Sequence, residues 1–330
     1  MFDAAKFATR DPVLTGFSTG YSDQDLSGAL IMPVTRVGTN SGRYLVFDRS
    51  AWMIFPDVRA QGTVANEIAG GKWAEDTFSV VEHSLQARVD DEEREEMAAA
   101  SSVDTPTLNL EQEAVGICTR SILLGHEKAV ADLIRNTATY PAGHTVTLTA
   151  GASGTQWNEY ASTNSDPVAN IRAALDKVFR ATRRKANTMV LSYDAFTQIP
   201  NHPKVVNRFV NFALTEGDVD AFRKLTGFTG TVIIPESGYN AADNIDATEN
   251  FTDLWGQDVW VGIVDSTPGQ KTKTFGKTFA RPYGADLRPT DRWREEPRKS
   301  DLFRVSYRYD LKVVSNNAGY LIKNAVAVPT

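Results

Sequence analysis

The clearest structural signal in the chain is the run Leu302-Phe303-Arg304-Val305-Ser306-Tyr307-Arg308-Tyr309-Asp310-Leu311-Lys312-Val313-Val314. Polar and apolar residues alternate through most of this run, so that arginine, serine and aspartate fall between valine, tyrosine and leucine. A period of two residues predicts a β-strand with one apolar and one polar face. A strand at residues 302–314 therefore needs an apolar surface elsewhere in the chain to cover one side.

A long helix predicted in the first half of the chain offers that surface. Asn109 can cap it, with Gln112 three residues later, and helical spacing continues to about Ala138. Its apolar stripe consists of Val115, Ile117, Cys118, Ile122, Leu124, Ala129, Val130, Leu133 and Ile134. Such a helix would be about 43 Å long, well beyond the usual three or four turns. We predict that strand 302–314 packs on it, where each buried large side chain would contribute roughly 1.5–3 kcal/mol.

The residues before this helix form two segments. Residues 1–40 are rich in Gly, Ser, Thr and Asp, and we expect an extended arm that lies on another surface. Residues 41–88 are strand-like on both sides of polar turns, which predicts a long two-stranded hairpin. The hairpin carries Trp52, Phe55 and Trp73. Because two strands alone bury aromatic groups poorly, we expect these three side chains to contact a partner chain.

The second half of the chain predicts a mixed α/β unit. Residues 143–165, rich in Gly, Ser, Thr and Asn, mark the boundary. Asp166 then supplies an N-cap and Pro167 the first position of a helix that ends near Asn187. Shorter helices are expected at 204–214 and 218–225, strands at 188–192, 231–234, 259–264 and 273–275, and a turn into a final apolar strand within residues 316–323.

Composition narrows the class of protein. The 330 residues carry a formal net charge of −6, which disfavours a free-standing nucleic-acid binder but is compatible with a container that encloses DNA. The sequence has no run of about 18 apolar residues and no apolar segment near its start. The single cysteine, Cys118, excludes an internal disulfide, and we expect a buried thiol in a reducing cytosol.

Motifs that resemble catalytic sites fail on context or spacing. Gly16-Phe17-Ser18-Thr19-Gly20 has the spacing of a hydrolase nucleophile elbow, but too few residues precede it. Phe275-Gly276-Lys277-Thr278 has Lys271 where a phosphate loop needs glycine. His126-Glu127-Lys128-Ala129-Val130 has valine where a zinc protease needs its second histidine, which predicts a surface or interface histidine. We therefore expect no catalytic residue, no metal site and no cofactor.

Two charged clusters are explained by solvation. The run Asp90-Asp91-Glu92-Glu93-Arg94-Glu95-Glu96 predicts a solvated acidic helix start or loop. Basic residues gather at the end of the helix that begins at Pro167, where the helix dipole favours positive charge. Two of them, Arg183 and Arg184, are secondary candidates for contact with phosphate or with another subunit.

The order of arm, hairpin, long helix, α/β unit and final alternating strand resembles the major capsid proteins of tailed bacteriophages with the Hong Kong ninety-seven fold. The resemblance covers almost the whole chain. The most family-like segments are Asn187-Thr188-Met189-Val190-Leu191-Ser192, Asn201-His202-Pro203, Trp255-Gly256, Tyr307-Arg308-Tyr309-Asp310 and Gly319-Tyr320-Leu321-Ile322.

The resemblance implies an α+β fold with a known division into an N-terminal arm, an E-loop hairpin over a neighbouring subunit, a P-domain with a spine helix, and an A-domain around the capsomer centre. The expected map assigns 1–40 to the arm, 41–88 to the E-loop, 89–165 and 282–314 to the P-domain, and 166–281 and 315–330 to the A-domain. Strand 302–314 is then expected in the P-domain sheet.

The resemblance also implies a structural role and no enzymatic one. The chain would self-assemble into hexamers and pentamers of an icosahedral shell that encloses double-stranded phage DNA through non-specific contacts. Further expected partners are a portal protein and, because only about 40 residues precede the hairpin, a separate scaffolding protein. No membrane is expected. The location would be the virion, after assembly in the host bacterial cytoplasm.

Two alternatives belong to the same resemblance. The fold also serves encapsulin-like compartments that enclose a cargo enzyme, and we favour the phage subunit because of the arm and the arginine-rich C-terminal segment. Some family members also join a loop lysine to an asparagine of a neighbour. Lys72 is the only lysine between residues 7 and 127, so it is the sole loop candidate, but we expect shells without this bond.

Overall fold

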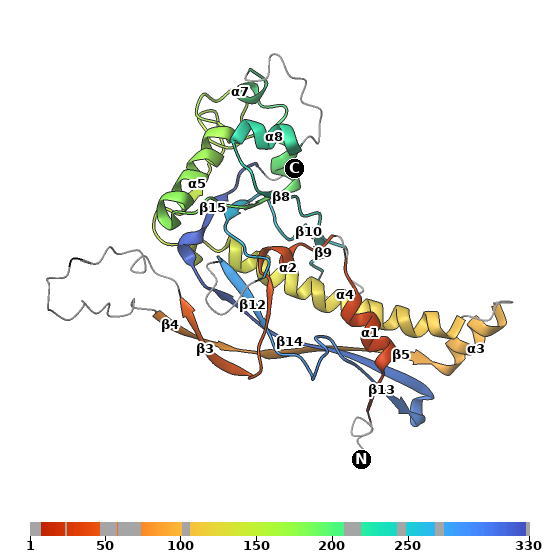
Figure 1. The fold of residues 1–330 in the computed structure, drawn as a ribbon. Helices are drawn as coiled ribbons and strands as arrows, with labels where there is room; N and C mark the ends of the chain where they lie inside the picture. Colours follow the sequence, from red (N-terminus) through yellow and green to blue (C-terminus); the bar gives the residue numbers. More distant parts are fainter. Residues whose placement is uncertain are drawn as a thin grey trace.

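The computed structural model describes residues 8–23, 25–46, 58, 74–100, 106–207, 219–242, 249–267 and 274–327. The described part of the molecule is elongated (Figure 1). A long sheet runs below helix α4 (Pro106–Arg135) in Figure 1. A second sheet and helix α5 (Pro167–Thr182) lie at the end of α4 that is opposite to helix α3 (Asp91–Ala100) (Figure 1). The chain is therefore built as two units joined along α4.

The first sheet has six strands organised around β14 (Ser300–Val313). Its order is β1-β13-β14-β12-β2, and β5 pairs with the opposite edge of β14 over ten residues. The other five strands are β1 (Thr9–Arg10), β2 (Val34–Arg36), β5 (Val81–Asp90), β12 (Gly276–Ala280) and β13 (Thr290–Glu295). Helix α3 (Asp91–Ala100) continues directly from β5.

The prediction that strand 302–314 packs on the long helix is confirmed. Val115, Cys118 and Ile122 of α4 share one buried cluster with Phe303, Val305, Tyr307 and Tyr309 of β14. These alternate residues of β14 form the expected apolar face. The helix itself begins at Pro106, three residues before the expected cap, and ends at Arg135.

The second unit contains the largest buried cluster of the described residues. Its five-stranded sheet has the order β6-β15-β11-β7-β8, and α5 packs on β15 and β11. The strands are β6 (Thr145–Thr147), β7 (Thr188–Leu191), β8 (Thr231–Ile233), β11 (Val259–Gly262) and β15 (Gly319–Lys323). Short helices α6 (Tyr193–Gln198), α7 (Pro203–Val206) and α8 (Val219–Thr226) and the two-stranded ribbon β9 (Gly238–Asn240) and β10 (Phe251–Asp253) complete the unit.

The N-terminal residues differ from the expected extended arm. Residues Pro12–Gly20 form helix α1, and Gly28–Ile31 form the short helix α2. Asp11 caps α1 by accepting hydrogen bonds from the backbone N–H groups of Val13 and Leu14, and Pro12 occupies the first helical position. The Gly-x-Ser-x-Gly segment thus lies within a helix. The segment is held on the body because Leu14 and Ile31 are buried there.

Three expected boundaries shift when strand pairing is known. The hairpin consists of β3 (Ser41–Val46) and β4 (Ala74–Ser79), whereas β5, expected as part of the same strand, belongs to the first sheet. β6 lies in the second sheet although residues up to 165 were expected in the P-domain. β12 begins at Gly276, after the strand expected at 273–275, and lies in the first sheet although residues up to 281 were expected in the A-domain. The chain crosses between the two units between Val264 and Gly276.

Candidate assembly surfaces

The base of the β3–β4 hairpin is fixed on the first sheet by a small core of its own. Phe78 stacks on Phe279 at a centroid distance of 4.7 Å, and Tyr44 packs on the same ring at 5.3 Å. The Tyr44 hydroxyl donates to Asp76 at 2.8 Å, and the Ser79 N–H donates to the Asp310 carboxylate at 2.8 Å. Burial, followed by the Asp76 hydrogen bond, raises the pKa of Tyr44. The direction in which the hairpin leaves the subunit is therefore set by its own sheet.

The structure describes only some of the contact residues predicted from sequence. Trp52, Phe55, Lys72 and Trp73 lie outside the described residues, so their contacts stay predictions. Arg183 and Arg184 are exposed at the end of α5. Arg183 forms the C-cap with a left-handed backbone, φ 55°, which leaves its side chain on the surface of the second unit.

Strand β5 forms an edge of the first sheet within the described residues. It pairs with β14 from Val81 to Asp90, and no described strand pairs with its outer edge. Val81 is 57% exposed and Leu85 is 44% exposed, although both point to the face that α4 partly covers. A ten-residue edge with exposed apolar side chains is a ready surface for another chain.

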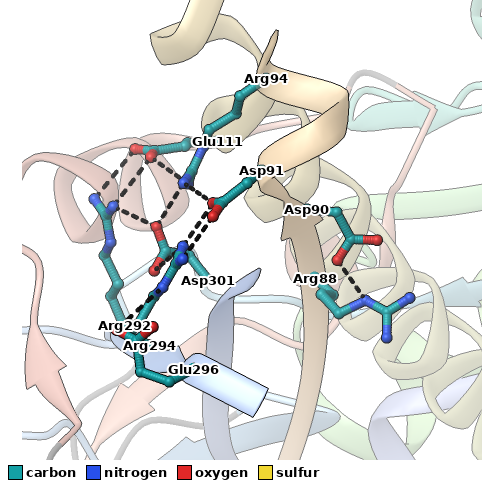
Figure 2. A network of polar contacts seen from close by, with 9 residues as sticks. All are labelled: Arg88, Asp90, Asp91, Arg94, Glu111, Arg292, Arg294, Glu296 and Asp301. Atoms are coloured by element: carbon teal, nitrogen blue, oxygen red, sulfur yellow. Dashed lines mark hydrogen bonds and ion pairs between the residues drawn. The ribbon is translucent and has the colours of Figure 1, made fainter. Parts of the chain in front are cut away.

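The far end of the first sheet carries a network of ion pairs that links four elements (Figure 2). Arg94 of α3 pairs with Glu111 of α4 at 2.9 Å and with Asp301 of β14 at 2.7 Å. Arg292 of β13 also reaches Asp301 at 2.7 Å, and Arg294 makes a bidentate pair with Asp91 at 2.6 Å. Part of the acidic run at residues 90–96 is thus a structural element rather than a solvated surface.

The two units and the N-terminal segment meet at Glu127, which is 1% exposed. Its carboxylate accepts hydrogen bonds from the Gly28 N–H, from Ser27 Oγ at 2.9 Å and from Trp255 Nε1 at 2.8 Å. Two separate parts of the chain, residues 27–28 and Trp255, therefore donate to one buried carboxylate on α4. The sequence analysis assigned no role to this residue.

The expectation that His126 is a surface or interface residue is wrong for the subunit. The ring is 4% exposed, lies edge-on to Tyr309, and its Nε2 lies 3.2 Å from Thr278 Oγ1. Burial, followed by the positive charges of His83 and Arg288, lowers the pKa of His126 to about 4. The helical spacing of the sequence predicts a buried position here, because residue 126 follows Ile122 by four residues on the buried face of α4.

A buried serine–histidine pair in the second unit is not arranged as a nucleophile and its base. Ser165 Oγ lies 3.0 Å from His202 Nε2 and donates to the Gln156 carbonyl at 2.7 Å. His202 Nδ1 accepts from the Lys204 N–H, so Nε2 carries the proton and donates to the serine oxygen. A base for serine would need Nε2 unprotonated. The described residues also contain no group of three or more potential metal ligands and no helix that could span a bilayer.

Comparisons with known proteins agree with this architecture. A family model described as "Phage major capsid protein E" matches residues 107–278. The chain is 26% identical over 322 residues to the major capsid protein of Burkholderia phage BcepMu, covering 96% of this chain and 97% of that protein. The crystal structure of a phage-related protein from Bordetella bronchiseptica RB50 is 27% identical with a TM-score of 0.75, covering 96% and 98% of the two chains.

More distant structures share the fold alone. The capsid structure of cyanophage P-SCSP1u has a TM-score of 0.55 at 13% identity and covers 89% of this chain and 86% of that one. The fold is therefore the α+β phage capsid fold of the Hong Kong ninety-seven type, as expected from the sequence.

Proposed function

Because the chain belongs to the phage major capsid protein E family and forms the icosahedral shell of a phage head, we propose that each subunit joins its neighbours through the β3–β4 hairpin. In this proposal Trp52, Phe55 and Trp73 lie over another subunit, where aromatic groups supply most of the contact energy. The encapsulin-like alternative has less support, because the family model and the sequence relative are phage capsid proteins.

The observation that carries the proposal is the anchoring of the hairpin base. Tyr44, Phe78 and Phe279 hold β3 and β4 in a fixed direction, with Tyr44 and Asp76 hydrogen bonded. A hairpin that already points in a fixed direction loses little conformational freedom on binding, which favours assembly of many identical subunits. The first sheet with α3 and α4 then serves as the P-domain, and the second sheet with α5 serves as the A-domain around the capsomer centre.

We propose the same partners that the family resemblance implies. Hexamers and pentamers of the chain form the shell, a separate scaffolding protein guides assembly in the host bacterial cytoplasm, and a portal protein occupies the DNA entry point. The shell encloses double-stranded DNA through non-specific contacts, which agrees with a net charge of −6 that avoids a tight grip on phosphate. The role is structural and uses no catalytic residue.

The hairpin proposal is tested with the triple variant W52A/F55A/W73A. We expect the free subunit to keep its melting temperature, and we expect the concentration needed for shell assembly to rise at least about tenfold. A control variant, Y193A/F251A, removes two exposed aromatic side chains of the second unit. Normal assembly of the triple variant, or an equal loss in the control, would overturn the proposal.

Arg183 allows folding and assembly to be separated. Its positive φ is unfavourable for a residue with a Cβ, so Arg183→Gly should leave the free subunit as stable or up to about 1 kcal/mol more stable. If Arg183 contacts a neighbour, the same variant will assemble into less stable shells, as judged by heating intact particles. Shells of unchanged heat resistance would remove Arg183 from the contact candidates.

A further inference from the structure

A cavity of about 430 Å³ opens between the N-terminal segment and α4, away from the hairpin and its core. One wall is formed by residues 21–23 and 26–34, and the other by α4 and the residues just before β13. Six aliphatic side chains contribute to the lining, namely Leu26, Ala29, Leu30, Val34, Leu123 and Leu287. The volume lies in the range that small-molecule sites occupy.

One part of the lining supplies hydrogen-bond donors. Arg288 Nη2 donates to the backbone carbonyls of Thr19 and Tyr21 at 2.7 and 3.0 Å, and its Nε is buried without a partner. Within the described residues Arg288 forms no ion pair with a carboxylate. Tyr307, which is 4% exposed, also lines the cavity and brings a hydroxyl group that can donate a hydrogen bond.

The two acids of the lining are already engaged. Asp23 pairs with Arg120 at 3.1 Å and not with Arg288. Glu127 accepts from Ser27, Gly28 and Trp255. Neither carboxylate therefore neutralises the guanidinium. A largely buried cation without a counter-charge is costly, and burial accordingly lowers the pKa of Arg288.

We propose that this cavity binds a carboxylate carried on an apolar body. The apolar walls would take the hydrocarbon part, and the carboxylate would accept hydrogen bonds from Arg288 and Tyr307. Charge-assisted bonds from arginine to a carboxylate are among the strong ones, so the charge and the apolar surface are both satisfied by one ligand. An alkyl carboxylate and a segment of a neighbouring subunit with an acidic and an apolar side chain share this chemistry.

The probe is decanoate, added to the free subunit below its micelle-forming concentration. We expect it to raise the melting temperature by about 2–4 °C at saturation. Decanol offers the same tail without charge, and decyltrimethylammonium offers it with a positive charge, and both should give a much smaller shift. Equal shifts from decanoate and decanol, or none from decanoate, would overturn the proposal.

Two variants localise the binding. Arg288→Met should abolish the difference between decanoate and decanol. Ala29 is exposed at the cavity rim, so Ala29→Phe should fill the space while leaving the body of the fold intact, and should remove the decanoate shift. Val206→Phe introduces the same aromatic side chain at an exposed site of the second unit and should not alter the shift. Full decanoate binding by Ala29→Phe would contradict the site even if Arg288→Met fails to fold.

Decanoate binding to assembled shells distinguishes the two possible sources of the natural ligand. If a neighbouring subunit supplies the carboxylate, decanoate will bind the free subunit and fail to bind the shell. If the ligand is a free amphiphile, shells will bind decanoate or release an alkyl carboxylate on extraction with organic solvent. The failure of the hairpin proposal would leave the decanoate result on the free subunit unchanged, so the two can be judged separately.

Discussion

At the scale of single residues, Glu127 connects three parts of the chain that are distant in sequence. Its carboxylate accepts from Ser27, Gly28 and Trp255, and all these groups are buried. Glu127→Ala would leave several buried donors unpaired, each at a cost of roughly 1–3 kcal/mol. We predict a fall of about 3 kcal/mol or more in the free energy of unfolding, measured by urea denaturation of the free subunit.

The control for this prediction lies on the same helix. Asp132 is exposed and pairs with Lys128, also exposed, so Asp132→Ala should change the free energy by less than about 0.5 kcal/mol. If Glu127→Ala is as mild as Asp132→Ala, the carboxylate does not hold the N-terminal segment on the two units.

His126 should make stability depend on pH. Its pKa is about 4 in the folded subunit and near 6.5 in the unfolded chain, so the unfolded chain binds the extra proton first as the pH falls. The stability that depends on keeping this ring neutral is fully present above about pH 6.5. As the pH falls toward 4, the free energy of unfolding decreases by roughly 3 kcal/mol in all from this group. Burial also lowers the pKa values of His83 and His202, which act in the same direction.

The comparison with His126→Gln isolates that contribution. We predict that the variant loses less stability than the natural chain between pH 7 and pH 4.5, as measured by urea denaturation at each pH. His83 and His202 remain in both proteins and cancel in the difference. Parallel pH curves for the two proteins would refute the assignment to His126.

At the scale of elements, Asp301 is the shared acceptor of the network that joins α3, α4, β13 and β14 (Figure 2). Burial raises its pKa, but hydrogen bonds from Arg94 and Arg292 outweigh burial and hold the pKa below the usual value. Asp301→Asn would leave these guanidinium groups without their common charge. We predict a loss of about 3 kcal/mol, in line with breaking a largely buried pair, measured by denaturation at low and high salt.

Glu296 provides the matched control for Asp301. It contacts Arg294 at 3.6 Å from a side chain that is 80% exposed. Glu296→Gln should therefore have almost no effect on stability. Similar losses in Asp301→Asn and Glu296→Gln would mean that the network contributes through general surface charge instead of through its buried acceptor.

The packing of β14 on α4 also yields a prediction. Tyr309 is 6% exposed and lies between His83, at a centroid distance of 4.3 Å, and His126, at 4.9 Å. Tyr309→Ala should destabilise the subunit by about 3–5 kcal/mol and lower its soluble yield and shell formation. Tyr193 is 58% exposed, and Tyr193→Ala should leave the soluble yield unchanged. An unaffected Tyr309→Ala subunit would contradict the two-layer packing.

At the scale of the whole molecule, local patterns predicted the elements better than their partners. The alternation of residues 302–314 and the Asp166-Pro167 start of α5 were sufficient to predict β14 and α5. The sheet to which β6 and β12 belong depends on pairing with distant strands, and periodicity carries no information on such pairs. The expected second hairpin strand divides at Val80 into β4 and β5 for the same reason, because β4 pairs with β3 and β5 pairs with the distant β14.

Other features carried a local signal that the sequence analysis missed. Asp11-Pro12 is the same start signal as Asp166-Pro167, but the glycines that follow it favoured an arm over helix α1. His126 and Glu127 follow the buried spacing of α4, yet charged and ionisable residues are expected on the outside. The cavity beside Arg288 needs three distant segments, so a sequence alone cannot predict it.

In the assembly proposed for this chain, the hairpin of each subunit lies on another subunit of a closed icosahedral shell. Cryo-electron microscopy of particles assembled from the full chain tests it most directly. We predict closed isometric shells in which β3 and β4 keep their direction from the first sheet and Trp52, Phe55 and Trp73 contact a neighbour. A protein that remains monomeric at all concentrations, or shells in which these three residues pack inside their own subunit, would contradict the account.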